Sequence, residues 1–460
     1  MCAQRFEKRL DLPVPASEAY GWHDRPGAFQ RLAPPWEPLE VLIPPRLENG
    51  TRAKFRMHFG PAHADWVARH ENIEPGHQFV DVQEQGPFAS WRHAHLFEQN
   101  QQAATLKDRV EYRLPLGALG EAVAGSWVRS RLERMFQYRH DVTRGDLLAH
   151  QRFGSPASLR VAVSGSSGLL GAALVPYLTT GGHDVLRMVR ASGPAEDELY
   201  WNPREGELQS ERLEGLDVVV HLAGESVFGS RWNPAKRQRI LQSRVEGTRL
   251  LAERMAQMEK PPKALICASA VGFYGDTGDE AVDENAPSGE GFLAEVCRAW
   301  EAAADAARDA GIRVVHLRFG VVLSPKGGAL KKQLPIFQLG GGGALGAGNQ
   351  WLSFIGLDDA LDIVLRSMVD ESWNGAVNVV CPEPVTQREF AATLGRVLAR
   401  PAFLPAPSFA LKMALGNDQA SEMLLASSRV RPGKLLAVQH PFRHPDLEST
   451  LRHCLGRPRR

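Results

Sequence analysis

Two different patterns of hydrophobic and polar residues divide the chain near residue 155. Before that point apolar and polar residues alternate in short segments, as at 53–59 and 105–112. Alternation with a period of two is typical of antiparallel strands that have one face in solvent. From about residue 119 to 139 the apolar residues instead recur every three or four positions, which predicts one long amphipathic helix. Strands followed by such a helix predict an α+β layer.

After residue 158 the pattern becomes strand, turn and helix. Short apolar runs that are rich in Val and Ile alternate with helical patterns, which is typical of a parallel sheet covered on both faces. The predicted strands are residues 159–164, 184–189, 217–222, 264–269 and 313–317. We therefore predict an α/β Rossmann fold, a doubly wound parallel sheet, after the α+β domain.

A glycine-rich turn follows the first of these strands. The turn reads Gly165, Ser166, Ser167, Gly168, Leu169, Leu170 and Gly171, and a helical pattern follows it. In a Rossmann turn the first glycine allows the tight bend, the second lets the backbone approach a pyrophosphate, and the third packs helix against strand. The free N–H groups at the start of the helix then hold the anion. These seven residues are predicted to bind a dinucleotide; the alternative is a tight turn with no ligand.

The end of the second strand indicates which dinucleotide is bound. An acidic residue there would accept the ribose hydroxyls of NAD(H), but this chain has Arg190 and Ser192 instead. An arginine pairs well with a 2′-phosphate, so NADP(H) is favoured over NAD(H). Alternatively, Arg190 is only a surface residue. Further on, small residues at a strand end predict close passage of the backbone along the cofactor, at Leu222, Ala223 and Gly224.

From about residue 159 onward the chain resembles the extended short-chain dehydrogenase/reductase (SDR) superfamily. More narrowly, it is similar to an atypical epimerase-family subgroup that has its own C-terminal domain of unknown function. The resemblance rests on the segments 164–171, 201–203, 221–226, 231–232, 243–248, 269–275, 297–301, 317–320, 351–359, 382–386 and 400–416. It implies an NAD(P)-binding domain over 159–395 and a C-terminal extension over 396–460, with Arg231 and Arg244 as anion or substrate contacts. Arg244 could instead be a structural ion-pair partner.

The first part resembles the helix-grip fold of the START-like/SRPBCC superfamily. The resemblance rests on the order of elements: a strand at 5–12, a helix that starts within 13–18, several strands and a long final helix. It implies a ligand-binding domain over 1–150, joined to the rest by a linker at 151–158. In that fold a curved sheet encloses a cavity for an apolar or amphipathic ligand. The candidate lining residues, which could equally be plain core, are Trp66, Phe79, Phe88, Trp91 and Phe97.

The usual SDR catalytic residues are missing from this chain. An SDR needs a Ser or Thr that polarises the substrate, and a Tyr acid/base whose pKa is lowered by a Lys four residues later. The resemblance places Ala270 at the Ser/Thr position, and Leu293 and Cys297 at the Tyr and Lys positions. No Tyr or Lys occurs anywhere in residues 275–309. Standard SDR proton transfer is therefore not expected.

Three residues near the empty positions remain as catalytic candidates: Ser269, Tyr274 and Cys297. Each has a simpler interpretation, because Ser269 could cap the strand, Tyr274 could pack, and a buried cysteine behaves as a small hydrophobic residue. Two functions stay open. The chain is either an NADP(H)-dependent oxidoreductase or epimerase with an unconventional acid, or a non-catalytic NADP(H)-responsive binding or sensor protein with a hydrophobic-ligand pocket.

Composition narrows the partners. Lys and Arg number 54 against 53 Asp and Glu, a net charge of +1, so nucleic acid is not an expected partner. The first residues contain no apolar signal segment and no stretch suits a membrane span, so a cytoplasmic protein with a small-molecule substrate or apolar ligand is expected. The five cysteines form no CxxC pair. His93 and His95 would share one strand face, but no carboxylate stands at ligand spacing in the sequence, so no metal is expected.

Overall fold

The computed structural model describes residues 3–59, 62–154, 158–191, 193 and 195–458 of the chain. The described residues form two compact units. The first unit contains the residues up to 154 together with 176–182, and the second contains 158–175 and 183–458. Residues 155–157 of the predicted linker lie outside the described residues.

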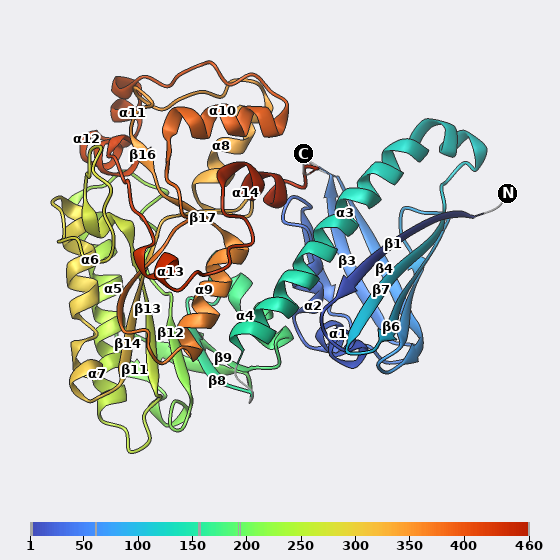
Figure 1. Cartoon of the computed structure of the whole chain (residues 1–460), viewed down its shortest axis with the longest axis horizontal. Coiled ribbons are helices and arrows are strands. Elements are labelled where there is room, and N and C mark those ends of the chain that lie inside the picture. The colour runs from blue at the N-terminus through green and yellow to red at the C-terminus, as the bar shows by residue number, and fades with distance from the viewer. Residues whose placement is uncertain (1–2, 60–61, 155–157, 192, 194, 459–460) are drawn as a thin grey trace. The chain divides into compact units, whose positions relative to one another are not determined.

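The first unit is built on a seven-stranded antiparallel sheet (Figure 1, blue). Its strands follow the order β1-β7-β6-β5-β4-β3-β2, so the first and last strands of this unit, β1 and β7, are paired. The strands are β1 (Gln4–Leu12), β2 (Leu39–Ile43), β3 (Arg52–Phe59), β4 (Ala62–Glu74), β5 (Gln78–Gln85), β6 (Ser90–Asn100) and β7 (Ala103–Arg113). The predicted alternation and the helix-grip domain are confirmed.

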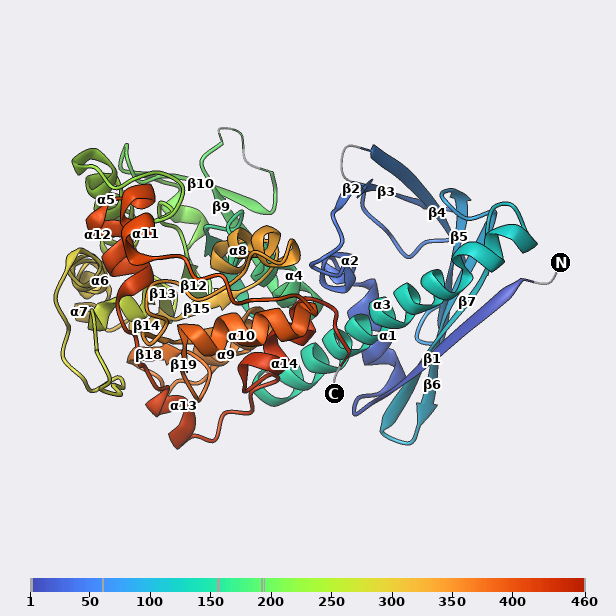
Figure 2. The same ribbon diagram turned by 90° about the horizontal axis from the view of Figure 1, so that it is seen from above.

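Three helices complete this unit: α1 (Ala16–Asp24), α2 (Ala28–Leu32) and α3 (Ala118–Phe153). The predicted stripe of α3 is confirmed, because Val128, Leu132 and Phe136 are buried against Phe6 and Trp91 of the sheet. Figures 1 and 2 show α3 running along the sheet.

The predicted end of this helix near residue 139 was wrong, since α3 continues to Phe153. Its last turns bury Val142 and Leu147 but also the polar residues His140, Thr143 and Asp146. Asp146 forms a buried ion pair with Arg31 of α2, at 2.7 Å. Polar groups that are buried with partners interrupt the hydrophobic pattern, so periodicity alone ended the helix too early.

The second unit is built on an eight-stranded sheet with the order β11-β10-β9-β8-β12-β13-β14-β18. All neighbours from β10 to β18 are parallel, and only β11 is antiparallel. The strands are β8 (Arg160–Ser164), β9 (Asp184–Val189), β10 (Glu198–Asn202), β11 (Glu207–Leu208), β12 (Val218–His221), β13 (Ala264–Ala270), β14 (Arg313–Phe319) and β18 (Gly375–Val379). All five predicted strands are present, and the doubly wound α/β Rossmann fold is confirmed.

Helices cover both faces of this sheet, with α5, α6 and α7 on one face and α9 on the other (Figures 1 and 2). Two small two-stranded pairs, β15 with β17 and β16 with β19, stand apart from it. The helices and these strands are α4 (Gly171–Thr180), α5 (Pro234–Ala256), α6 (Phe292–Ala302), α7 (Asp305–Asp309), α8 (Gly328–Gln338), α9 (Leu357–Val369), α10 (Gln387–Leu398), α11 (Ser408–Leu415), α12 (Asn417–Ala420), α13 (Gly433–Ala437), α14 (Leu447–Cys454), β15 (Val321–Leu323), β16 (Trp351–Leu352), β17 (Phe354–Gly356) and β19 (Val385–Thr386).

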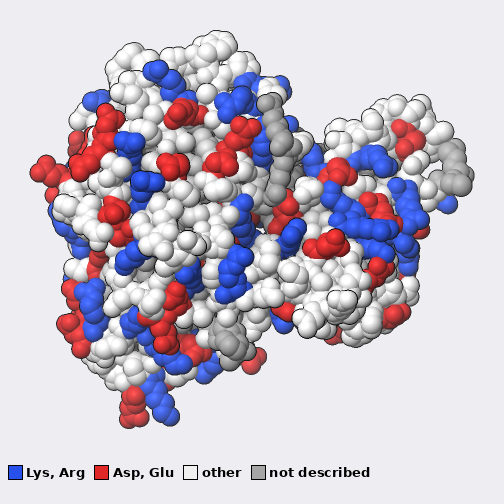
Figure 3. Space-filling view, viewed as in Figure 1, with Lys and Arg blue, Asp and Glu red and all other residues white. Residues whose placement is uncertain are grey.

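The distribution of charged side chains on the surface reflects the balanced numbers of basic and acidic residues in the chain. Acidic and basic side chains are interspersed on the face drawn in Figure 3. Among the described residues, no helix combines the length and the apolar character that a bilayer crossing requires.

Replacing Phe136 with alanine is expected to destabilise the first unit. Its ring is fully buried and lies 5.2 Å from the ring of Phe6. Removing it leaves a cavity between α3 and the sheet, which should cost about 3–5 kcal/mol. Hydrogen exchange of the β6 and β7 amides in the full chain measures this loss. The exposed neighbour Gln137→Ala is the control, and equal protection in both variants would show that α3 does not hold the sheet.

Candidate functional site

The glycine-rich turn joins β8 to α4, and two of its glycines are required by packing. A Cβ on Gly165 would lie 2.8 Å from the backbone of Leu222 and Ala223, and Gly165 has a φ of +69°. A Cβ on Gly171 would lie 2.2 Å from the carbonyl oxygen of Gly165. Both positions therefore need glycine whether or not a ligand binds.

Gly168 is different, because a Cβ there would meet only the Gly165 carbonyl oxygen, at 3.2 Å. Gly168 is exposed, and among the described residues the amide N–H groups of Ser167, Leu169 and Leu170 have no hydrogen-bond partner. Unpaired amides around an open glycine form a cradle that suits an anion. The turn thus fits the pyrophosphate of a dinucleotide.

The neighbouring strand end is fixed to this turn by Ser164. Its Oγ lies 2.6 Å from Nδ1 of His221 and accepts hydrogen bonds from the Leu222 and Ala223 amides. Burial, with Arg244 nearby, lowers the pKa of His221 to about 3, so its imidazole is neutral. The hydroxyl and the ring hold the backbone of 222–224 beside the turn, where the sequence predicts cofactor contacts.

Arg190 follows β9 and is exposed. Within the described residues its side chain has no recorded ion pair or hydrogen bond, so the guanidinium is available to an anionic ligand. Ser192, its predicted helper, lies outside the described residues. The structure therefore leaves Arg190 free to act as predicted.

Arg244 of α5 is held by carbonyl groups, since it donates to the backbone oxygens of Glu225 and Ile240 at 2.9 and 3.1 Å. Its guanidinium also lies over the Trp300 ring and beside Gly224. Burial lowers the pKa of this guanidinium. The contacts explain a structural role for Arg244, without the ion pair considered from the sequence.

The hydroxyl groups of Ser269 and Tyr274 belong to one buried network. Ser269 donates to Glu301 at 2.7 Å, and Glu301 accepts two hydrogen bonds from Arg318 at 2.9 and 2.8 Å. Arg318 also donates to the Tyr274 hydroxyl, which itself donates to Asn378 at 2.8 Å. Both hydroxyls are thus hydrogen-bonded inside the protein.

Burial shifts the pKa values of the ionisable groups in and beside this network. Burial raises the pKa of the Tyr274 phenol. Burial alone would also raise the pKa of Glu301, but the Arg318 guanidinium holds it below its usual value. Cys297 is 3% exposed, and burial raises the pKa of its thiol to about 11. Tyr274 and Cys297 are therefore poor bases at neutral pH, and all three catalytic candidates contact protein groups.

The C-terminal segment contacts the helix that carries Cys297. Both carboxylate oxygens of Glu422 accept hydrogen bonds from the first amides of α6, those of Phe292 and Leu293, at 3.2 and 2.9 Å. A carboxylate is stabilising at the positive end of a helix. Sequence reasoning missed this contact because it joins residues about 130 positions apart.

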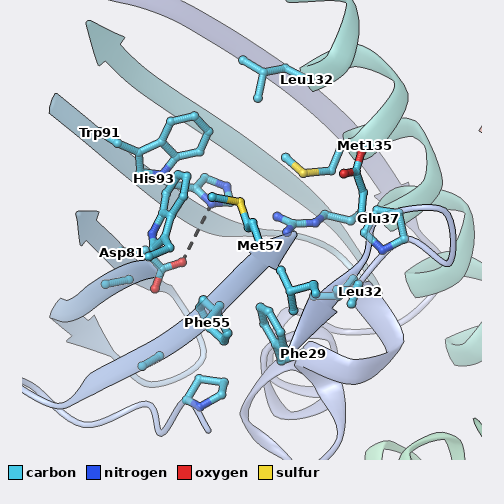
Figure 4. Close-up of a pocket in the computed structure, with 18 of the residues that line it drawn as sticks. Phe29, Leu32, Glu37, Phe55, Met57, Asp81, Trp91, His93, Leu132 and Met135 are labelled. Atoms are coloured by element: carbon cyan, nitrogen blue, oxygen red, sulfur yellow. Dashed lines mark ion pairs between the residues drawn. The ribbon is translucent and has the colours of Figure 1, made fainter. Parts of the chain in front are cut away.

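The first unit contains an apolar cavity of about 400 Å³ (Figure 4). Side chains of α2, β3, β6 and α3 line it, among them Phe29, Phe55, Trp91 and Leu132. Of the five predicted lining aromatics, Trp66, Phe79, Phe88 and Trp91 face the cavity. Phe97 does not, and instead packs in the core beside Leu12 and Trp22.

Comparisons with known proteins match this division. The model of the NAD dependent epimerase/dehydratase family matches residues 161–379, that of polyketide cyclase / dehydrase and lipid transport matches 12–136, and a domain of unknown function (DUF1731) matches 406–454. Epimerase family protein Mb2239 of Mycobacterium bovis is 40% identical over 302 residues, which cover 66% of this chain and 99% of that protein. The chain belongs to the epimerase family.

The expected SDR and START-like/SRPBCC resemblances are therefore confirmed, and the chain carries an NAD(P)-binding fold. Two solved structures that are similar to this chain come from a bacterium and from human. The structure of the nucleoside-diphosphate sugar epimerase from Corynebacterium glutamicum is 36% identical, with a TM-score of 0.80. The match covers 98% of this chain and 90% of the epimerase chain. The structure of human epimerase family protein SDR39U1 with NADPH is 33% identical, with a TM-score of 0.59. The match covers 65% of this chain and 99% of the human chain.

The substitution Gly168→Asp is expected to abolish NADPH binding. It places a carboxylate in the open cradle, where like charges repel, and affinity should fall at least about 100-fold. Isothermal titration measures the loss. The control is Ala310→Asp, an exposed position just before β14 and so at the opposite end of the parallel sheet. Unchanged affinity in Gly168→Asp would refute the assignment of the turn.

Tyr274→Phe is expected to destabilise the second unit, because it removes the hydroxyl that pairs with Nη1 of Arg318 and with Oδ1 of Asn378. An unsatisfied buried group costs about 1–3 kcal/mol. Hydrogen exchange of the β13 and β14 amides gives the change in free energy. Tyr200→Phe makes the same change at an exposed hydroxyl bonded to Glu207 and should have little effect. Equal results for the two variants would contradict the structural role of Tyr274.

Proposed function

We propose that this member of the epimerase family binds NADP(H) in its second unit and an apolar small molecule in its first, and responds to NADP(H) without standard SDR catalysis. One observation carries the proposal. The glycine-rich turn has open, unpaired amides that suit an anion. The hydroxyls of Ser269 and Tyr274, in contrast, are hydrogen-bonded to the buried pair of Glu301 and Arg318. A protein that needs only to bind the cofactor requires the first feature and tolerates the second.

NADP(H) rather than NAD(H) is supported by two observations. Arg190 is exposed directly after β9, where a 2′-phosphate would lie in a Rossmann site. The human relative SDR39U1 was solved with NADPH. The apolar ligand is supported by the cavity of the first unit, which has the size and lining of a small-molecule site.

An oxidoreductase or epimerase with an unconventional acid is the second candidate. It is favoured by the likeness to the nucleoside-diphosphate sugar epimerase structure, which extends over 98% of this chain. That reaction would need a proton donor other than Ser269, Tyr274 and Cys297, or a rearrangement that frees one of them.

Turnover separates the two candidates. Purified full-length protein is given NADPH with a panel of aldehydes, ketones, enones and nucleotide sugars, and cofactor absorbance is followed. The binding protein should retain stoichiometric NADPH with no oxidation beyond that of a Gly168→Asp control. Sustained oxidation would overturn the proposal, and the rates of Tyr274→Phe and Cys297→Ala would then identify the acid.

Coupling between the two ligands tests the response itself. A fluorescent apolar dye is titrated into the protein with and without NADPH. Because binding free energies are reciprocal, a responsive protein must change dye affinity with NADPH and NADPH affinity with dye by the same factor. Gly168→Asp should show dye binding with no NADPH effect. Equal dye affinities with and without NADPH in the unmodified chain would refute the response.

Arg190→Asp tests the cofactor preference. Hydrogen bonds to charged groups contribute roughly 1.5–3 kcal/mol, so NADPH affinity should fall about 10- to 100-fold. NADH affinity should be retained, which reverses the preference. Arg249→Asp, an exposed position on α5, is the charge-matched control. An unaltered ratio would show that Arg190 does not contact the 2′-phosphate.

A further inference from the structure

We propose that Asp81, His93 and His95 form a site for a divalent transition-metal ion of the zinc type at the wall of the cavity in the first unit. One ligand atom from each residue lies within 4.8 Å of the others. All three side chains line the cavity, and Figure 4 shows Asp81 and His93 paired there.

The register of the sheet creates this cluster. His93 and His95 stand two residues apart on β6, so both point to the same face. On β5, Asp81 is the direct cross-strand partner of His93. From the sequence no metal was expected, because no carboxylate stood at ligand spacing. The β5–β6 pairing supplies that carboxylate from 12 residues upstream of His93, where sequence spacing could not indicate it.

The separations suit a shared ion. Asp81 Oδ2 lies 3.3 Å from His95 Nε2 and 3.9 Å from His93 Nδ1. Two ligands of a tetrahedral zinc ion, each at ~2.0–2.1 Å, stand roughly 3.3–3.4 Å apart. Two imidazoles and one carboxylate are also a ligand set that protein zinc and iron sites use while leaving coordination positions open.

The opposite atoms of the ligands are held by a second layer of residues. Nε2 of His93 lies 2.9 Å from Asp108 Oδ1, and Nδ1 of His95 lies 2.9 Å from the same oxygen, although without hydrogen-bond alignment. Nε2 of His70 lies 2.9 Å from Asp81 Oδ1. Such partners orient metal ligands and fix which ring nitrogen faces the ion. In the tautomer that donates from Nε2 to Asp108, the Nδ1 of His93 that faces Asp81 is unprotonated and can bind a metal ion.

Charge in this region also favours a cation. Asp81 lines the cavity, and Asp108, which is 3% exposed, lies against the other side of His93. Arg139 lines the same cavity and interacts electrostatically with both, and the imidazoles of His70 and His140 each lie against one of them. Buried charges of one sign are costly unless they are paired or bind a metal ion.

The open coordination positions of the ion would face the cavity, since three protein ligands come from the sheet alone. If the first unit binds an apolar ligand as proposed above, an oxygen of that ligand's head group would complete the coordination. The metal site itself does not depend on NADP(H) binding, so the two proposals fail separately.

Metal binding by the tag-free full-length chain tests the proposal. The protein is stripped with a chelator, titrated with Zn²⁺ against a chromophoric competitor, and its metal content is measured by mass spectrometry after gel filtration. We expect one tightly bound zinc per chain. A folded chain that takes up no zinc would overturn the proposal, and would mean that protons alone hold the histidine and aspartate network.

Variants locate the ion. Asp81→Asn and His93→Gln should each lower zinc affinity at least about 100-fold, since loss of an outer-sphere partner alone costs 10- to 100-fold. His58→Gln is the matched control, because His58 lines the same cavity outside the triad. Near-UV circular dichroism checks the first unit of each variant, and NADPH affinity checks the second. Undiminished zinc uptake in folded Asp81→Asn and His93→Gln would refute the site.

Cobalt gives an answer that needs no variant. Co²⁺ in place of zinc should show the visible bands of a four- or five-coordinate nitrogen and oxygen site, altered by an apolar carboxylate or carbonyl compound. An intense thiolate charge-transfer band would place the ion on a cysteine and overturn the assignment. Retained NADPH binding in that case leaves the proposed function of the second unit intact.

Discussion

The buried pair of Glu301 and Arg318 organises the part of the second unit where SDR chemistry would normally occur. The two side chains share two hydrogen bonds and join α6 to β14. Because a buried ion pair is stable only when its remaining polar atoms are satisfied, the pair recruits the hydroxyls of Ser269 and Tyr274. The Tyr274 hydroxyl in turn donates a hydrogen bond to Asn378 of β18. The network thus links the neighbouring strands β13, β14 and β18 to α6.

The glycine-rich turn between β8 and α4 differs from this network, because it leaves backbone amide groups unpaired among the described residues. Gly165 and Gly171 are fixed by the close approach of backbones, whereas Gly168 leaves open space beside unpaired amides. The open turn thus contrasts with the hydroxyls of Ser269 and Tyr274, which are hydrogen-bonded inside the protein. Our proposal of NADP(H) binding without standard SDR catalysis rests on this contrast.

Local patterns predicted much of the fold and less of the sites. Five of the eight strands in the main sheet of the second unit, and the turn at 165–171, were predictable because each depends on neighbours in sequence. The full length of α3 was not, since its last turns bury His140 and Asp146 with partners from elsewhere. Asp81 beside His93 and Glu422 beside Leu293 depend on strand register and on long-range docking. Ser269 and Tyr274 were identified as candidates, and Arg318 lies in a segment that carries the family resemblance, but nothing in the sequence indicated that these residues share a network.

The contact of Glu422 with α6 has a consequence for how the chain should be divided. Family models treat 161–379 and 406–454 as separate stretches, yet the second stretch supplies the carboxylate that accepts hydrogen bonds from the first amides of α6. The C-terminal stretch is thus not a portable module. Transplanting it onto another Rossmann protein, or exchanging it between relatives, would require the start of α6 to travel with it, and the two should change together as the family diverges.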